Sequence, residues 1–237
     1  MKPIKGMRHE IKILLSYGEY ISMASKIKCV AVPDKHSLSN GEYFIRSLYL
    51  DDMYNTAFIT KISGVDNRKK YRIRCYNNSK DVIKFECKNK YNNRIHKISF
   101  NITFEQYNMF MEGNYDFLTS IDHPLAGEIY GLIKSRGLCP SVIADYDREA
   151  YLHPLSNTRL TFDKNLCAGI NSFNIFDDSM YTLPVFQNSS VIFEIKYNDY
   201  IPAHIADIIA SLRGTKMALS KFCMCKEKLL EVKKYEY

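Results

Sequence analysis

The sequence predicts an α+β protein in which antiparallel strands dominate and helices are added around them. Two observations support this class. Many short segments alternate apolar and charged residues with the two-residue period of a strand, and the segments between them carry helix-capping signals. No repeat, low-complexity stretch or Pro/Gly/Ser-rich linker divides the 237 residues, so residues 1–237 are expected to form a single domain.

The N-terminal half is expected to form a strand, a helix and then a series of strands. Residues 7–15 alternate like a strand, and Ser16 with Glu19 has the spacing of a capping box, which predicts a helix to about residue 30. The next elements are a turn at Asn40-Gly41 with a strand to residue 52, a loop and short helix over 51–60, and strands at 70–77, 81–89 and 91–102.

The C-terminal half is expected to begin with a helical insert. Thr103, with Gln106 three residues later, has the form of a second capping box. An apolar stripe through Leu125, Ile129 and Ile133 predicts another helix. Strands follow at 141–152, 158–166 and 189–198, and the chain ends in a helix over 202–234 that is interrupted near Gly214.

Composition limits the classes of function. Apolar residues make up 46% of the chain, enough for a core, and no apolar run approaches the roughly 20 residues of a membrane span. The first residues contain no secretory signal, and the seven cysteines lack metal-ligand spacing. A cytoplasmic protein with reduced thiols is therefore expected. The net charge of +7 favours a polyanionic partner.

Six predicted strands carry charged side chains at alternate positions, so each strand presents one charged face. The sets are Arg8, Glu10 and Lys12; Arg72 and Arg74; Lys84, Glu86 and Lys88; Tyr146 and Arg148; Arg159, Thr161 and Asp163; and Glu194 and Lys196. A sandwich with a charged solvent face is one interpretation, and a closed sheet around a wet, charged lumen is the other. The pattern leaves both open.

The strand over 189–198 bears on that choice. Its other face carries Val191, Phe193, Ile195 and Tyr197 and is expected to pack against another element, such as a helix. If both faces are covered, the charged one must line a cavity. A lining of many Arg and Lys with a few carboxylates suits a phosphate chain with divalent cations, because Arg and Lys bind phosphate oxygens and carboxylates bind hard metals.

Eight motifs in order give a family resemblance. Between about residues 8 and 222 the chain reads RHEIK, SLYLDD, RKKYRIRCY, FECKNK, ADYDREAY, RLTFDKNL, VIFEIKY and LSKF. This order resembles the catalytic domain of the vacuolar transporter chaperone (VTC) polyphosphate polymerases, which belong to the triphosphate tunnel metalloenzymes, or CYTH-like proteins. The chain looks like a stand-alone form of the sort that bacteria carry. The resemblance implies a closed antiparallel β-barrel with a basic tunnel.

The resemblance also implies roles for particular residues. Lys12, Lys88 and Lys97 match tunnel lysines, and Glu194 matches the glutamate that binds Mn²⁺ or Mg²⁺. The residues implied to bind the phosphates of the nucleotide and substrate are Arg72, Arg74, Arg148, Arg159, Ser220 and Lys221. Glu10, Glu86 and Asp163 are weaker metal candidates and are expected to form ion pairs instead. Tyr146 is the one aromatic residue expected near the site.

Two positions depart from the family pattern. Ser99 stands where the family usually has a basic residue. Some members have an additional lysine just before the Ser-Lys pair, where this chain has Met217, Ala218 and Leu219. Lys216 is the nearby basic residue that could substitute. These departures bear on the efficiency of catalysis more than on the fold.

The implied activity is transfer of the γ-phosphoryl group of ATP to a growing polyphosphate chain. The attacking phosphate oxygen is already ionised at neutral pH, so no dedicated base is needed. The implied partners are ATP and polyphosphate, and coupling to transport would need a separate membrane protein. A nucleic-acid partner is not expected, because the charges alternate along strands instead of forming a broad stripe.

Two alternatives stay open. An inorganic triphosphatase of the same fold commonly has E-x-E-x-K on its first strand, whereas this chain has Arg8-x-Glu10-x-Lys12, which favours the polymerase. A polyphosphate-binding module without turnover is the other alternative, and the two departures from the family pattern keep it in play.

Overall fold

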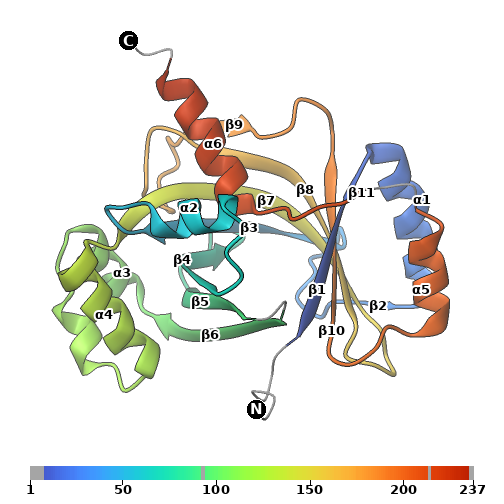
Figure 1. The fold of residues 1–237 in the computed structure, drawn as a ribbon, viewed down its shortest axis with the longest axis horizontal. Coiled ribbons are helices and arrows are strands. Elements are labelled where there is room, and N and C mark those ends of the chain that lie inside the picture. The colour runs from blue at the N-terminus through green and yellow to red at the C-terminus, as the bar shows by residue number, and fades with distance from the viewer. Residues whose placement is uncertain (1–7, 92–93, 213–214, 235–237) are drawn as a thin grey trace.

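The computed structural model describes residues 8–91, 94–212 and 215–234. Its main element is one antiparallel sheet (Figure 1). The strand order is β11-β1-β10-β8-β7-β3-β4-β5-β6, with β2 added beside β7 and β9 beside β8. The strands are β1 (His9–Leu15), β2 (Val32–Pro33), β3 (Glu42–Asp51), β4 (Arg68–Tyr76), β5 (Ile83–Tyr91), β6 (Arg94–Ile102), β7 (Cys139–Leu152), β8 (Arg159–Gly169), β9 (Thr182–Pro184), β10 (Val191–Tyr197) and β11 (Thr215–Lys216).

Helices pack around the sheet (Figure 1). They are α1 (Tyr17–Lys28), α2 (Thr56–Ile62), α3 (Phe104–Met111), the 3₁₀ helix η1 (Asp116–Ser120), α4 (Pro124–Arg136), α5 (Ala203–Ala210) and α6 (Lys221–Lys233). Both predicted capping boxes are present: Ser16 pairs with Glu19 at the start of α1, and Thr103 with Gln106 at the start of α3. None of the described helices has the length and apolarity needed to cross a membrane.

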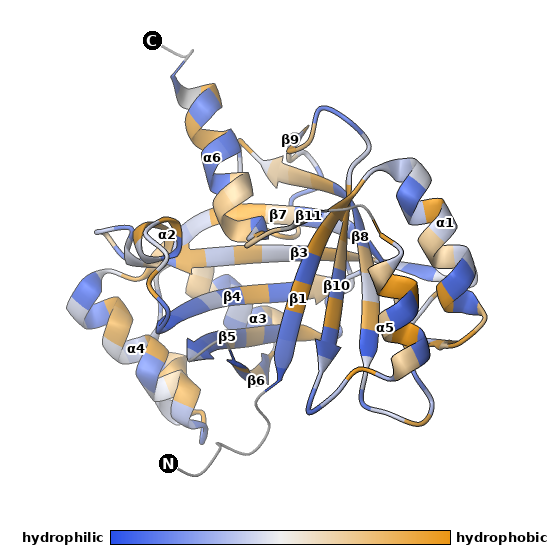
Figure 2. Cartoon of the chain, turned by 45° about the vertical axis from the view of Figure 1, so that its right-hand side comes forward, coloured by the Kyte–Doolittle hydropathy of each residue, from blue (hydrophilic) through white to orange (hydrophobic). Residues whose placement is uncertain are grey.

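Alternation along the strands separates a core face from a charged face. The apolar residues of β4 and β5, such as Ile73 and Phe85, pack with Phe110 of α3 and Ile129 of α4 in one buried cluster. Arg72, Arg74 and Glu86 lie on the opposite side of the same strands, as the two-residue period requires. Figure 2 shows the same alternation of hydrophobic and hydrophilic bands along β10.

The apolar face of β10 packs against helices, as the sequence predicts. Val191, Phe193 and Ile195 lie in a buried cluster with Met23 and Ile27 of α1 and with Ile205 of α5. Because successive side chains on a strand point to opposite faces, Glu194 and Lys196 lie on the other side of the sheet from α1 and α5.

The predicted closed barrel is not formed, and the sheet remains a curled, open one. Within the described residues its two edges meet at one bridge, in which Arg8 and Ile95 exchange backbone hydrogen bonds of 3.0 and 2.9 Å. The C-terminal part of the free edge of β1 is occupied by β11, which pairs with Ile13 and Leu14, and by Met217, whose N–H donates to the Lys12 carbonyl at 3.1 Å. A β1–β6 ladder therefore cannot extend over Lys12–Leu14.

The C-terminal helix also differs from the prediction over residues 202–234. The interruption runs from the end of α5 to the start of α6 and contains β11. Because the segment after residue 214 is extended along β1, it cannot continue a helix. The predicted break at Gly214 itself lies outside the described residues.

Helix α6 lies on the same side of the sheet as the charged residues. Phe222, Cys225 and Leu229 pack in a buried cluster with Val142, Ala144 and Leu166 of β7 and β8. The helix therefore fills one part of this face with apolar side chains and brings its N-terminus to the remaining part.

Candidate functional site

The charged faces of the strands line a cavity of about 760 Å³. Among the described residues its lining contains two carboxylates, Glu10 and Glu194, and fourteen basic side chains. The basic side chains are Arg8, Lys12, Lys61, Arg68, Lys70, Arg72, Arg74, Lys88, Lys90, Lys97, Arg148, Arg159, Lys196 and Lys221. Every basic residue that the resemblance assigns to the site is among them, so the structure brings these residues together.

In the cavity wall formed by β4, β5 and β6, Glu86 is the central carboxylate that pairs with the basic side chains around it. It is 1% exposed and lies opposite Arg72 on β4 and Ser99 on β6. Its carboxylate contacts Arg72 at 2.6 Å and Lys97 at 2.8 Å, and Arg74 lies 3.9 Å away. Burial alone would raise the pKa of Glu86, but the three cations hold it well below its usual value.

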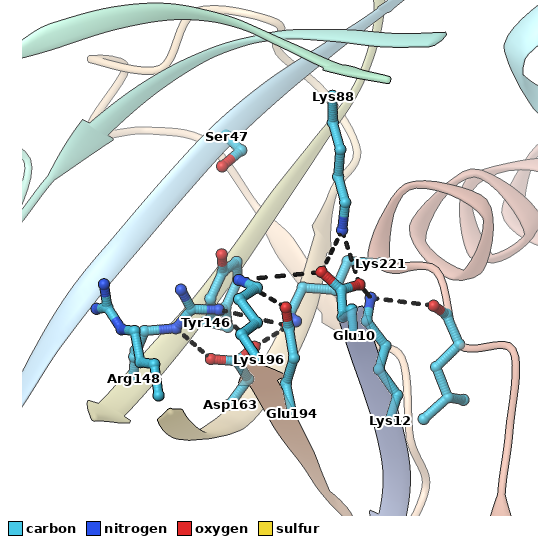
Figure 3. A network of polar contacts seen from close by, with 12 residues as sticks. Glu10, Lys12, Ser47, Lys88, Tyr146, Arg148, Asp163, Glu194, Lys196 and Lys221 are labelled. Carbon is cyan, nitrogen blue, oxygen red and sulfur yellow. Dashed lines mark hydrogen bonds and ion pairs between the residues drawn. The ribbon is translucent and has the colours of Figure 1, made fainter. Parts of the chain in front are cut away.

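The opposite wall, formed by β1 and β10, holds two carboxylates among lysines (Figure 3). Glu10 accepts hydrogen bonds from Lys88 at 2.7 Å and contacts Lys12 at 3.2 Å. Lys196 lies between the two carboxylates, 2.7 Å from Glu194 and 4.0 Å from Glu10. Burial would raise the pKa of Glu194, yet Lys196, Lys12 and Lys88 hold it well below its usual value, so both carboxylates are anionic.

Asp163 joins β8 to β7 and α6 at the base of the cavity. It accepts two hydrogen bonds from Arg148, at 2.6 and 2.8 Å, and a further one from Lys221 (Figure 3). This bidentate pairing fixes the plane of the Arg148 guanidinium. Despite burial, Arg148 and Lys221 hold the pKa of Asp163 below its usual value. The expected ion pairs of Glu10, Glu86 and Asp163 are thus confirmed.

Tyr146 lies in the cavity wall, where the sequence places it. Its hydroxyl accepts a hydrogen bond from Arg74 at 2.8 Å, and the cations of Arg148 and Lys221 lie 5.3 and 4.7 Å from its ring centroid. Burial raises the pKa of Tyr146 to about 12, so the phenol stays protonated. Tyr146 therefore lies between Arg74, Arg148 and Lys221 and contacts all three cations.

The N-terminus of α6 enters the cavity through Ser220 and Lys221. Ser220 is the N-cap, and its hydroxyl oxygen accepts from the Cys223 backbone N–H at 3.3 Å and from the Lys70 ammonium at 2.6 Å. Lys12 fixes the preceding turn by donating to the Leu219 carbonyl at 3.2 Å.

Arg159 is held at the edge of β8. Its guanidinium contacts Asp34 at 2.7 Å and donates to the Tyr43 hydroxyl at 2.9 Å, while its buried Nε has no hydrogen-bond partner within the described protein. The Nη2 end of this guanidinium group is therefore fixed by Asp34 and Tyr43.

Sequence reasoning missed several basic residues of the cavity. Arg68 and Lys70 share the face of Arg72 and Arg74 on β4, and Lys90 shares that of Lys88 on β5, so the alternation could have identified them. Lys61 comes from α2, and no strand pattern indicates it. The side chain of Lys216 lies outside the described residues, so its substituting role stays a prediction.

A divalent metal fits the carboxylates on β1 and β10. In the described part of the chain no group of three His, Cys, Asp or Glu side chains could hold a metal alone. Mg²⁺ and similar ions are commonly bound by one or two carboxylates, with phosphate oxygens and water completing the shell. Glu194 and Glu10, which share Lys196 as a neighbour, provide such a pair.

Two solved structures resemble this fold. One is a "putative adenylate cyclase" from Bacillus halodurans, with 11% identity over 91% of this chain and 94% of that chain and a TM-score of 0.54. The other is a "putative adenylyl cyclase" from Hippeastrum, described as having a dominant triphosphatase activity, with 10% identity over 94% and 95% of the two chains and a TM-score of 0.53.

The family comparison extends over nearly the whole chain. None of the curated proteins matches the sequence significantly. The model of the VTC domain matches residues 7–230, which include every residue of the cavity lining. The chain therefore belongs to the VTC domain family.

Proposed function

We propose that this protein is an ATP-dependent polyphosphate polymerase that transfers the γ-phosphoryl group of ATP to the end of a polyphosphate chain. One observation carries the proposal: among the described residues, the cavity is lined by fourteen basic side chains and two carboxylates. Such an excess of positive charge in a confined space suits a ligand with several adjacent phosphates. Membership of the VTC domain family supports the same activity.

In this reaction a terminal oxygen of the polyphosphate chain attacks the γ-phosphorus of ATP. The bond from the γ-phosphorus to the β–γ bridging oxygen breaks, and ADP leaves. Both the attacking and the leaving oxygens are anionic, so the protein must position them and neutralise their charge. Arg72, Arg74, Arg148 and Arg159 would hold the triphosphate. Lys12, Lys88, Lys97 and Lys221 would guide the chain, and Ser220 would donate to a phosphate oxygen.

Glu194 would hold Mn²⁺ or Mg²⁺, with Glu10 beside it. When bound, such an ion would neutralise negative charge on the phosphate oxygens. In this proposal ATP and polyphosphate are the partners, the protein acts in the cytoplasm, and any transport of the product requires a separate membrane protein.

An inorganic triphosphatase is the second candidate function. The Hippeastrum structure, which has the same fold, is described as having a dominant triphosphatase activity. Against this candidate, Arg8 replaces the first glutamate of the E-x-E-x-K strand that such hydrolases commonly have, which leaves Glu10 as the carboxylate of β1 in the cavity lining.

The test is incubation of the pure protein with ATP and Mn²⁺, with polyphosphate resolved on a gel and free phosphate measured in parallel. A ladder of chains is expected from the native protein and from Glu105→Gln, an exposed carboxylate on α3. Glu194→Gln should abolish the ladder and still bind tripolyphosphate, because the basic lining remains.

Free phosphate without chains would replace the polymerase with the triphosphatase. Binding of polyphosphate without either product would leave a binding module.

A further inference from the structure

Lys70 differs from Arg72, Lys88 and Lys12, which are paired with carboxylates, in its contacts. It lies on β4, on the same face as Arg72 and Arg74, and its ammonium group lines the cavity. Its hydrogen bond is to a neutral group, the Ser220 hydroxyl at 2.6 Å, and its Nζ lies 5.4 Å from the centroid of the Phe222 ring. Within the part of the chain that the structure describes, no carboxylate lies within ion-pair distance of Lys70.

Two of the neighbouring cations, Arg72 and Lys88, are paired with carboxylates. Arg72 contacts Glu86 at 2.6 Å, and Lys88 contacts Glu10 at 2.7 Å. Because these carboxylates compete with a phosphate ligand for the same cations, part of each cation's charge is already compensated. Lys70 has no such competitor, so its charge is fully available to an anion.

The elements around Lys70 supply cations and neutral groups. Arg68 lies on the same strand, Lys88 on β5 and Lys12 on β1, and their electrostatic effects all disfavour a positive charge at Lys70. Lys61 of α2 lines the same cavity. From α6, Ser220 accepts the hydrogen bond, and Cys223 favours the charged state.

We propose that Lys70 is an additional phosphate-binding residue of this cavity, and that it takes up a proton to bind an oxygen of a condensed phosphate. The inference rests on the proposed function for the identity of the ligand. It deepens that function by making substrate binding depend on the protonation of Lys70.

The direction of the pH dependence follows from the environment of Lys70. Burial lowers the pKa of Lys70 to about 7, and Lys12, Lys88 and Arg68 act in the same direction. The side chain is therefore charged below about pH 7 and increasingly neutral above it. A phosphate binds the charged form, so affinity should fall as the pH rises through 7.

The experiment is calorimetric titration of the native protein with inorganic tripolyphosphate, without metal, at about pH 6 and about pH 8.5. Lys70→Arg keeps a permanent charge, and Lys70→Met keeps the chain length without charge. Lys134→Met, at an exposed lysine on α4 that is outside the cavity lining, is the matched control. Urea unfolding of each variant checks that it is folded.

At about pH 6, Lys70→Met should weaken binding about ten-fold or more, as expected for loss of a charged hydrogen bond, and Lys134→Met should not change it. Between the two pH values the native protein should lose more affinity than Lys70→Arg. This comparison removes the titration of tripolyphosphate itself, which is the same for both proteins.

The outcomes separate this inference from the proposed function. The native protein could make a polyphosphate ladder while its affinity for tripolyphosphate changes with pH as much as that of Lys70→Arg does. That result would overturn the role of Lys70 and leave the polymerase intact. No ladder, together with Lys70-dependent binding, would support Lys70 and reject the polymerase. Absence of tripolyphosphate binding at both pH values would overturn the inference.

Discussion

Asp163 in the cavity wall is 1% exposed and is paired with two cations. Its contacts with Arg148 and Lys221 connect β8 to β7 and to the first residue of α6. Buried charges of this kind are costly unless they are paired, so the three side chains depend on one another.

We expect Asp163→Asn to lower the free energy of unfolding by about 3–5 kcal/mol, because two buried cations lose their carboxylate. The pKa of Asp163 is lowered in the folded protein, so its contribution is present above the unfolded pKa and lost as pH falls through the folded value. The difference between native protein and variant should therefore shrink below about pH 4. Urea unfolding at several pH values measures it.

Asp178→Asn, at an exposed loop position, is the control and should leave stability within about 0.5 kcal/mol. Equal stability of the native protein and Asp163→Asn at neutral pH would contradict this account.

At the level of elements, the helix starts are set by local sequence. The Ser16 hydroxyl accepts from the Glu19 N–H, and the Glu19 carboxylate accepts from the Ser16 N–H at 2.8 Å. These contacts involve neighbours in the chain, so the S-x-x-E pattern was sufficient to predict them. The helix predicted over residues 202–234 is divided by β11. This strand forms by pairing with the free edge of β1, a contact between distant residues that local sequence does not indicate.

Ser16→Ala should destabilise the protein by about 1 kcal/mol, because the first turn of α1 loses its cap. Ser25→Ala on the same helix is the matched control: Ser25 is exposed, and its hydroxyl bonds the Ile21 carbonyl, which already lies in the helix. Urea unfolding compares the two. A larger loss for Ser25→Ala than for Ser16→Ala would rule out the capping argument.

On the scale of the whole molecule, the basic cavity is a source of repulsion that an anion relieves. The net charge of the chain is +7, and fourteen basic side chains gather around about 760 Å³. A ligand that binds only the folded state stabilises it by mass action.

Tripolyphosphate at 100 times its dissociation constant should raise the free energy of unfolding by about 2.7 kcal/mol. The gain should fall at high salt, where charge interactions are screened. Urea unfolding with and without the ligand measures this. Sulfate at equal ionic strength is the control, and an equal gain with sulfate would mean that the cavity responds to ionic strength and not to linked phosphates.

The sequence by itself determined the long strands, the two capping boxes and the side of each of these strands that carries charge. These features depend on backbone geometry and on residues a few positions apart, so the two-residue period and the S-x-x-E spacing were enough. The same period placed Lys12, Arg72, Arg74, Lys88, Arg148, Arg159 and Glu194 on charged faces, and all of them line one cavity.

Only the tertiary structure decided how those charges are paired and how the sheet ends. Lys12 bonds the Leu219 carbonyl across 207 positions of sequence, and Lys70 meets Ser220 across 150. Such contacts depend on how the sheet curls and where α6 lies, which no local period specifies. For the same reason β11 occupies the edge of β1 beside Ile13 and Leu14, so β6 does not pair with β1 at these two residues.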